Sequence, residues 1–442
     1  MSLKDKASYI FKPSRYKSGT AYAFRGSDLT ALRSSTGTRV NASGNIESVA
    51  SGTPRLNYDP TDLTKEPWVL YEKAATNILA NSNSYSTYDK PTSGNISYEE
   101  NATISPDGTS NAVKIKVNFN STYTYFRDVT ATVSNTFSVF VKKGNWRFIG
   151  IRNADASGIH SVFDFDLGEF TSVISGHTCS VTKYKDGWYR LSDYVESASA
   201  TNGLKSLCFC ESATSGSEGS TIQVGAYYYA YGWQSETGVK VPTSYIPTSG
   251  SSATRAADTL YANSISSSIG SGQGVVYCDF YGQPGDTGSY ENMFSINVGS
   301  ISASVNIFKH ANGTFYYEVY NGGSAVVFST YNSSATTSYR TKMAVYYANN
   351  DFGLYINGVK VHSDTGGTAP TGMSSINFSA PAGGYPGTKD IYEFLLFKER
   401  LSDAELASLT SFDDYEELVD IKGLTWESST ITNNRLSELA AL

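Results

Sequence analysis

The stretch from Val224 to Asp258 divides this chain into two structural units. It begins with an alternating aromatic run, VGAYYYAYGWQ from Val224 to Gln234, and Tyr and Trp are favoured on the pleated, half-buried surface of a β-strand. It continues into Pro242–Asp258, where two prolines, a glycine and many small hydroxyl residues are typical of a connection between domains. We therefore expect one β-rich domain to end near Gly250 and a second to begin there.

Composition supports β-sandwiches and excludes several classes of function. The chain has 442 residues, more than one ordinary core accommodates, and its charged residues make up only 17%. Its net charge of −7 argues against a nucleic-acid partner, which requires a basic surface. No apolar run approaches a membrane span, and the N-terminal MSLKDK lacks the apolar core of a signal peptide. We expect no membrane insertion, and synthesis in a cytoplasm without export by the signal-peptide route.

Short alternating segments predict the first sandwich, which we place at residues 61–250. They are separated by Gly, Asn, Asp and Ser, as in a jelly roll. The predicted strands are Ala112–Val117, Thr136–Lys142, Arg147–Arg152, Ser161–Leu167, Cys179–Lys185, Trp188–Tyr194, Leu204–Cys210 and Ile222–Trp233.

A hairpin and a helix start mark the second sandwich, at residues 251–415. Asn357-Gly358 is the favoured pair for a type I′ turn, and apolar residues alternate on both sides of it. After a buried strand near Asp390, Ser402 and Glu405 form a capping box that predicts a short helix. The four cysteines are too few and too irregular for a disulfide scaffold, and we expect them to be small buried groups.

Two terminal segments complete the predicted organisation. Residues 1–60 alternate weakly and contain too few apolar groups for a core, so we expect them to pair with partner chains or lie along the next domain. Residues 416–442 end in a helical pattern, Asn434–Leu442. The predicted fold class is all-β: two tandem jelly-roll β-sandwich domains between an N-terminal segment and a short helical C-terminal tail.

Several motifs carry a family resemblance. Glu72–Leu79 (EKAATNIL), Ser105–Ala112 (SPDGTSNA), Asp186–Arg190 (DGWYR) and Pro242–Leu260 (PTSYIPTSGSSATRAADTL) occur in this order. Together they resemble a carbohydrate-binding-module-like domain of bacteriophage tail and virion proteins. In the second half, Tyr355–Val361 (YINGVKV) and Phe394–Leu406 (FLLFKERLSDAEL) resemble the concanavalin A-like (laminin-G-like) lectin domain. Both of these motifs are structural in that family.

The N-terminal residues resemble the opening of many phage virion proteins. The matching stretches are Pro13–Tyr22, Arg33–Val49 and Arg55–Asp59. The resemblance implies an anchoring or oligomerising role toward other virion proteins, although an ordinary set of N-terminal strands is the alternative. It further implies a virion location after assembly in the bacterial host cytoplasm, surface glycans as partners, and a homotrimer, because phage fibres are commonly threefold.

An acidic string offers the strongest hint of catalysis. In Asp164–Glu169 (DFDLGE), alternation would place Asp164 and Asp166 on one face, where two carboxylates could divide acid and base roles. However, Gly168 predicts a turn before Glu169, and the string fits a strand-turn of the binding-module family. Neither a nucleophile elbow, a zinc-protease motif nor a P-loop is present. We therefore expect no enzymatic activity.

Glycan contact is predicted to use exposed aromatic rings, on which the C–H faces of sugars stack. Tyr227, Tyr229 and Tyr231 share one face of their strand and Tyr228 takes the other, and one of the two faces must be core. The full set of candidates is Tyr123, Tyr125, Tyr227, Tyr229, Tyr231, Trp233, His310 and Tyr316. No cofactor is expected apart from a structural calcium ion, which both resembled families often carry and for which the candidates are Asp107, Asp258 and Asp390.

Three hypotheses follow. The first is a non-enzymatic structural protein of a bacteriophage virion, a fibre- or spike-like appendage of tail or capsid that displays glycan-binding domains. The second is a polysaccharide depolymerase, and the third is a purely architectural virion protein that binds no glycan.

Overall fold

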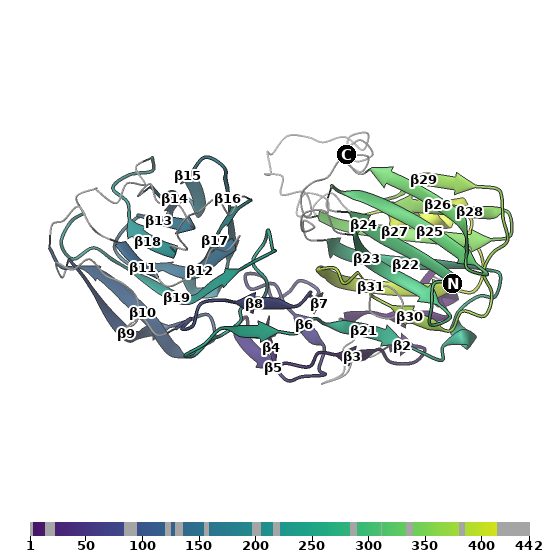
Figure 1. Cartoon of the computed structure of the whole chain (residues 1–442), viewed down its shortest axis with the longest axis horizontal. Coiled ribbons are helices and arrows are strands. Elements are labelled where there is room, and N and C mark those ends of the chain that lie inside the picture. Colours follow the sequence, from purple (N-terminus) through teal and green to yellow (C-terminus); the bar gives the residue numbers. More distant parts are fainter. Residues whose placement is uncertain are drawn as a thin grey trace.

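The chain folds into two β-sandwiches that lie side by side, with short strands between them (Figure 1). The computed structural model describes residues 3–13, 23–83, 95–119, 125–128, 136–153, 159–196, 205–214, 222–282, 290–310, 312–332, 339–379 and 385–412. The predicted all-β fold class is confirmed: among the described residues, α1 (Asp403–Thr410) is the one α-helix.

The first sandwich packs a six-stranded sheet on a five-stranded sheet. The six-stranded sheet has the order β16-β17-β12-β19-β10-β9, and the five-stranded sheet has the order β11-β18-β13-β14-β15. The first contains β9 (Ile96–Ile104), β10 (Ser110–Val117), β12 (Thr136–Lys143), β16 (His177–Lys183), β17 (Trp188–Val195) and β19 (Tyr227–Glu236). The second contains β11 (Tyr125–Asp128), β13 (Phe148–Asn153), β14 (Ser161–Asp164), β15 (Glu169–Ser172) and β18 (Lys205–Phe209).

Alternating side chains from both sheets fill the first core. Phe209 and Tyr228 face each other across it, with ring centroids 4.7 Å apart. The predicted alternation of the tyrosine run is confirmed, since Tyr228 is in the core and Tyr229 faces the other way. Trp233 departs from that alternation. A β-bulge at Gly232, whose φ is +63°, turns the Trp233 indole into the core.

The second sandwich packs a nine-stranded sheet on a seven-stranded sheet. The nine-stranded sheet contains β1 (Tyr9–Phe11), β2 (Ala23–Arg25), β6 (Arg55–Asn57), β7 (Trp68–Tyr71), β22 (Gln273–Gly282), β27 (Tyr339–Ala348), β28 (Asp351–Ile356), β29 (Val359–Asp364) and β31 (Lys389–Phe397). The seven-stranded sheet contains β3 (Thr30–Leu32), β21 (Thr259–Ala262), β23 (Tyr290–Asn297), β24 (Ala303–His310), β25 (Thr314–Asn321), β26 (Ser324–Asn332) and β30 (Ser375–Asn377).

The N-terminal strands join the second sandwich, which the sequence did not indicate. β1 pairs with β31, so that Tyr9 lies opposite Leu396, and β3 pairs with β21. The hairpin of β4 (Gly37–Val40) and β5 (Ile46–Val49) and the pair of β8 (Ala75–Asn77) with β20 (Ala253–Arg255) lie between the two sandwiches (Figure 1). Strands of residues 1–60 therefore form part of both sheets of the second sandwich, whereas the β4–β5 hairpin packs on the first one through Ile46.

The predicted turn and the predicted helix start, which depend on neighbouring residues, are both confirmed. Asn357 and Gly358 have φ of 49° and 84°, as the predicted type I′ turn requires. The capping box of Ser402 and Glu405 starts α1. The predicted strand Ser161–Leu167 is shorter, because β14 ends at Asp164 and a turn at Gly168 follows.

Three cysteines are buried, as expected, whereas Cys179 is only partly buried. No helix in the described ranges is long and apolar enough to cross a membrane. The predicted C-terminal helix, Asn434–Leu442, lies outside the described residues.

Candidate functional site

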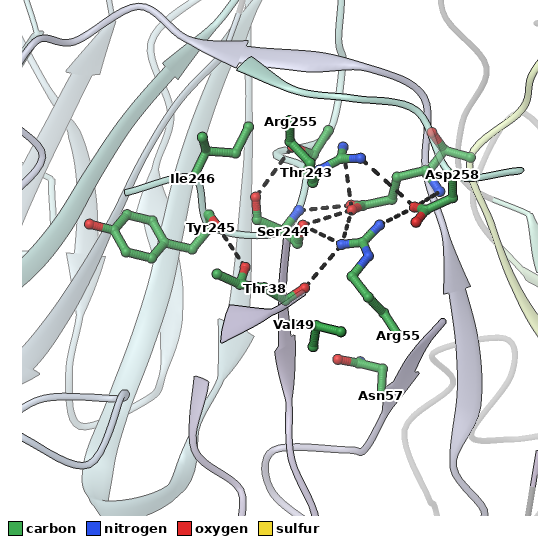
Figure 2. Close-up of polar contacts among 12 residues, drawn as sticks. Thr38, Val49, Arg55, Asn57, Thr243, Ser244, Tyr245, Ile246, Arg255 and Asp258 are labelled. Atoms are coloured by element: carbon green, nitrogen blue, oxygen red, sulfur yellow. Dashed lines mark hydrogen bonds and ion pairs between the residues drawn. The ribbon is translucent and has the colours of Figure 1, made fainter. Parts of the chain in front are cut away.

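A buried ion-pair network joins the two sandwiches (Figure 2). Arg55 on β6 contacts Glu72, with 2.7 Å between Nη1 and Oε2, and also ion-pairs with Asp258. Arg33 lies 2.9 Å from Asp258, and Arg255 lies 3.4 Å from Glu72. These five side chains come from segments up to 225 residues apart and are all at most 10% exposed. They hold β6, β7 and β20 against one another.

The loop after β19 closes the network from the first sandwich. Ser244 donates from its backbone N–H and its hydroxyl to the Glu72 carboxylate, both at 2.7 Å, and the Arg55 guanidinium donates to the Ser244 hydroxyl. Burial by itself would raise the pKa of Glu72, but Arg255 and Arg55 outweigh it and lower the pKa to about 2. Glu72 is therefore ionised at neutral pH and fixes the loop relative to β7.

The motifs behind the family resemblance supply this junction. Glu72 and Asn77 belong to the first motif, and Ser244, Arg255 and Asp258 belong to the last. Asn77 donates to the backbone oxygens of Trp233 and Ile246, at 3.1 and 2.9 Å, and so ties β8 to the end of β19. These motif residues stabilise the arrangement of the domains.

The predicted aromatic candidates of the first sandwich separate into two groups. Tyr227 and Tyr229 are partly exposed and form an edge-to-face pair with ring centroids 5.6 Å apart. The ammonium of Lys114 lies 4.4 Å from the Tyr227 ring centroid, so the chain itself occupies one face of that ring. Tyr231 and Trp233 are buried, with 3% and 0% exposure.

The Tyr231 hydroxyl has a structural partner. It donates to Asp107 at 2.9 Å, and its ring packs with Phe140, Tyr245 and Ile46 beneath the β4–β5 hairpin. Tyr123 lies outside the described residues, and for Tyr125 only the backbone, in β11, is described.

The candidates of the second sandwich lie together in an exposed row of rings. His310 on β24 and Tyr316 on β25 both approach Tyr290 on β23, with ring centroids 4.9 and 5.1 Å away. Tyr316 in turn contacts Phe328 on β26 at 6.0 Å. Tyr290 is 42% exposed and Phe328 is 62% exposed. We call Tyr290, His310, Tyr316 and Phe328 the aromatic strip.

Sequence reasoning found two members of the aromatic strip and missed Tyr290 and Phe328. The alternation of β26 could have identified Phe328 as an exposed ring, because Val327 points into the core and Phe328 points outward. Tyr290 is missed for another reason. It stands opposite His310 only because β23 and β24 pair in this register.

The two aspartates of the acidic string pair with neighbouring cations. Asp164 accepts two hydrogen bonds from Arg147, at 2.9 and 2.7 Å, and Asp166 ion-pairs with Lys143 and Arg147. The hydrogen bond from Arg147 lowers the pKa of Asp164. A glycosidase needs one carboxyl whose pKa is raised so that it can protonate the leaving group. Asp164, whose pKa is lowered, is not such a group.

The three metal candidates have different surroundings. Asp258 is held by arginines, and Asp107 accepts hydrogen bonds from Thr109, Asn111 and Tyr231. Asp390 on β31 is buried, and burial followed by the nearby charge of Glu72 raises its pKa to about 8. Within the described ranges, no group of three His, Cys, Asp or Glu side chains could hold a metal ion. The described residues therefore offer no set of ligands for the predicted calcium ion.

No protein-family model matches this chain, and no curated protein sequence matches it. Solved structures with partial similarity include the Ruminococcus gnavus IT-sialidase CBM40 bound to α2,6-sialyllactose, at 16% identity and a TM-score of 0.28, covering 32% of this chain and 85% of that chain. The NanB sialidase of Streptococcus pneumoniae matches at 18% identity and a TM-score of 0.28, covering 34% of this chain and 26% of that chain. A leech intramolecular trans-sialidase matches at 17% identity and a TM-score of 0.29, covering 33% and 24%. At this level of similarity nothing follows about a ligand or a reaction of this chain.

Proposed function

We propose that this protein is a non-enzymatic glycan-binding component of a bacteriophage virion, a fibre- or spike-like appendage that attaches to host or environmental glycans. The observation that carries the glycan-binding part is the aromatic strip. Monomeric proteins seldom expose contiguous apolar surface without a binding role, and here four rings meet edge to face on one sheet surface.

The geometry of the strip suits an extended saccharide. Its four residues lie on four neighbouring strands, and three strand spacings of about 4.8 Å give a length of about 14 Å. Exposed ring surfaces offer stacking for sugar C–H groups along this length. We therefore place an oligosaccharide across β23 to β26.

Polar groups beside the strip can meet sugar hydroxyls. Glu318 stands opposite Phe328 in the β25–β26 register and is partly buried, which raises the pKa of its carboxyl. Tyr320 hydrogen-bonds to Glu318 from the same strand face. A ring surface bordered by a carboxyl and hydroxyls is the combination that orients a saccharide.

The virion role rests on the sequence resemblance alone. It includes attachment to other virion proteins through residues 1–60, assembly in the bacterial cytoplasm and a threefold oligomer. A mass-spectrometric inventory of purified virions tests the location, and light scattering on the isolated protein tests the trimer.

The test of glycan binding is an array of bacterial surface polysaccharides probed with the wild type and with a Tyr316→Ala/Phe328→Ala double variant. Each lost ring contact is worth about 1 kcal/mol, so the double variant is expected to bind about 30-fold more weakly. Phe119→Ala is the matched control, because Phe119 is 59% exposed on the first sandwich and lies outside the strip. Equal binding by the double variant would exclude the strip as the site, and an array without hits would favour the architectural alternative.

The same glycans test the depolymerase alternative. We expect no release of reducing ends from any polysaccharide that the protein binds. Turnover that disappears in Asp166→Asn would replace the present proposal.

A further inference from the structure

Glu318 places a carboxylate on the sheet surface that carries the aromatic strip. It stands two residues from Tyr316 on β25, so both side chains face away from the core. Its cross-strand neighbour on β26 is Phe328, and its neighbour on β24 is Asn306. Side chains directly opposite each other in an antiparallel pair have Cβ atoms about 4.5–5.5 Å apart. The Glu318 carboxylate therefore lies beside the Phe328 ring.

The other charged side chains of β23 to β26 do not balance this carboxylate. Glu291 and Lys309 stand opposite each other, are 3% and 4% exposed, and point to the opposite face of the sheet from the strip. β26 contains no charged residue. His310 lies about 13 Å away along the strand direction, because the register places it level with a position four residues before Glu318.

Glu318 forms no ion pair with any described residue. Its carboxylate accepts a hydrogen bond from the hydroxyl of Tyr320, on the same face of β25. Partial burial raises the pKa of Glu318, because the ionised carboxylate has lost part of its contact with water. A cation placed against the carboxylate would offset that cost. The aromatic strip is thus a row of rings with an uncompensated negative charge beside its last ring.

This charge distinguishes among classes of saccharide. An acidic sugar would bring a second carboxylate to Glu318, and like charges repel each other. A neutral sugar would hydrogen-bond to Glu318 without compensating its charge. A sugar with a free amino group instead carries an ammonium at mildly acidic pH. That ammonium makes a charge-assisted hydrogen bond to a carboxylate and is also attracted to the faces of neighbouring rings.

We propose that the aromatic strip selects saccharides with a free amino group, and that Glu318 is the residue that determines this selectivity. The ammonium pairs with the Glu318 carboxylate while the sugar ring stacks on Tyr316 and Phe328. This selectivity rests on the proposed glycan binding by the strip, to which it adds the class of glycan. A partly deacetylated polymer of N-acetylglucosamine is a saccharide of this class.

The test compares two β-1,4-linked hexasaccharides that differ only in N-acetylation: hexaglucosamine, whose amines are free, and hexa-N-acetylglucosamine, which is neutral. Calorimetry is run at pH 6 with the full chain, on the wild type, Glu318→Gln and Glu100→Gln. Glu100 is exposed on β9 of the first sandwich, so the control removes the same charge away from the strip. We expect the wild type and the control to bind hexaglucosamine about tenfold more tightly than the neutral hexasaccharide, and Glu318→Gln to bind the two alike.

The selectivity and the glycan binding itself fail in different ways. Tyr316→Ala/Phe328→Ala should weaken the binding of both hexasaccharides, and unchanged binding by this variant would exclude the strip as the site and so overturn both proposals. Equal affinity of the wild type for the two hexasaccharides, or a preference that persists in Glu318→Gln, would overturn the amino-sugar selectivity alone.

Two other outcomes also count against the selectivity. Loss of both ligands in Glu318→Gln would assign Glu318 a structural role and overturn it. A wild type that binds neither hexasaccharide would overturn it as well, and the polysaccharide array would then decide by itself whether the strip binds glycans.

Discussion

The buried junction network permits a comparison between removing a cation and removing an anion. Three guanidinium groups and two carboxylates give it a net charge of +1. Arg55→Met leaves two arginines and two carboxylates, with Arg33 still 2.9 Å from Asp258 and Arg255 still 3.4 Å from Glu72. Asp258→Asn instead leaves three buried arginines around one carboxylate. We therefore expect Asp258→Asn to destabilise the protein more than Arg55→Met, although each changes the net charge of the network by one.

The structure sets the magnitude of each effect. Breaking a buried ion pair by removing one partner costs about 3–5 kcal/mol. The fall in the pKa of Glu72 from 4.5 to about 2 corresponds to about 3 kcal/mol of favourable coupling. Arg55→Met, which leaves the charges balanced, should lie near 3 kcal/mol. Asp258→Asn, which leaves like charges unshielded, should lie near 5 kcal/mol.

The assay is guanidinium chloride denaturation at pH 7, followed by tryptophan fluorescence and circular dichroism. At that pH the stabilising contribution of Glu72 is fully present. Because the pKa of Glu72 is lower in the folded protein, this contribution exists above the pKa of the unfolded chain and is lost as pH falls toward 2. Arg39→Met is the control, because the Arg39–Glu47 pair is partly exposed and should be worth at most about 1 kcal/mol. Equal losses for Arg55→Met and Asp258→Asn would refute the charge-balance reasoning.

Two further predictions concern single positions. Burial and the Glu72 charge raise the pKa of Asp390 to about 8, so its stabilising contribution is present at low pH and is lost as pH rises through 8. Relative to Asp390→Asn, the wild type should therefore lose up to about 4 kcal/mol of unfolding free energy between pH 5 and pH 8, measured by denaturation at both values. Gly144→Ala should cost about 1–3 kcal/mol, because its Cβ would lie 2.3 Å from the Tyr227 carbonyl oxygen. Gly366→Ala, whose Cβ would have one neighbouring atom at 3.5 Å, should be nearly neutral when both variants are compared by thermal melting.

Local patterns predicted much of the framework. Period-two segments gave most strands of the first sandwich, the Asn357–Gly358 pair gave a turn of the second sandwich, and Ser402 with Glu405 gave the start of α1. Each of these features depends on residues a few positions apart. Their physical cause is therefore contained in a short stretch of chain.

The candidate site was only partly predictable for the opposite reason. Alternation placed Tyr229 and Tyr231 on one face of β19, but it did not show that the β4–β5 hairpin covers Tyr231 and leaves Tyr229 partly open. The bulge at Gly232 reversed the side on which Trp233 lies. Exposure depends on what packs over a strand, and that partner is distant in sequence.

By itself, the sequence determined the all-β class, the positions of most strands and the chemistry of turns and caps, because these follow from neighbouring residues. Only the tertiary structure decided that β1 pairs with β31, that Glu72 and Asp258 meet three arginines, and that Tyr290 and Phe328 join His310 and Tyr316. These contacts connect segments far apart in the chain. Strand register and packing, which bring such segments together, are properties of the whole fold.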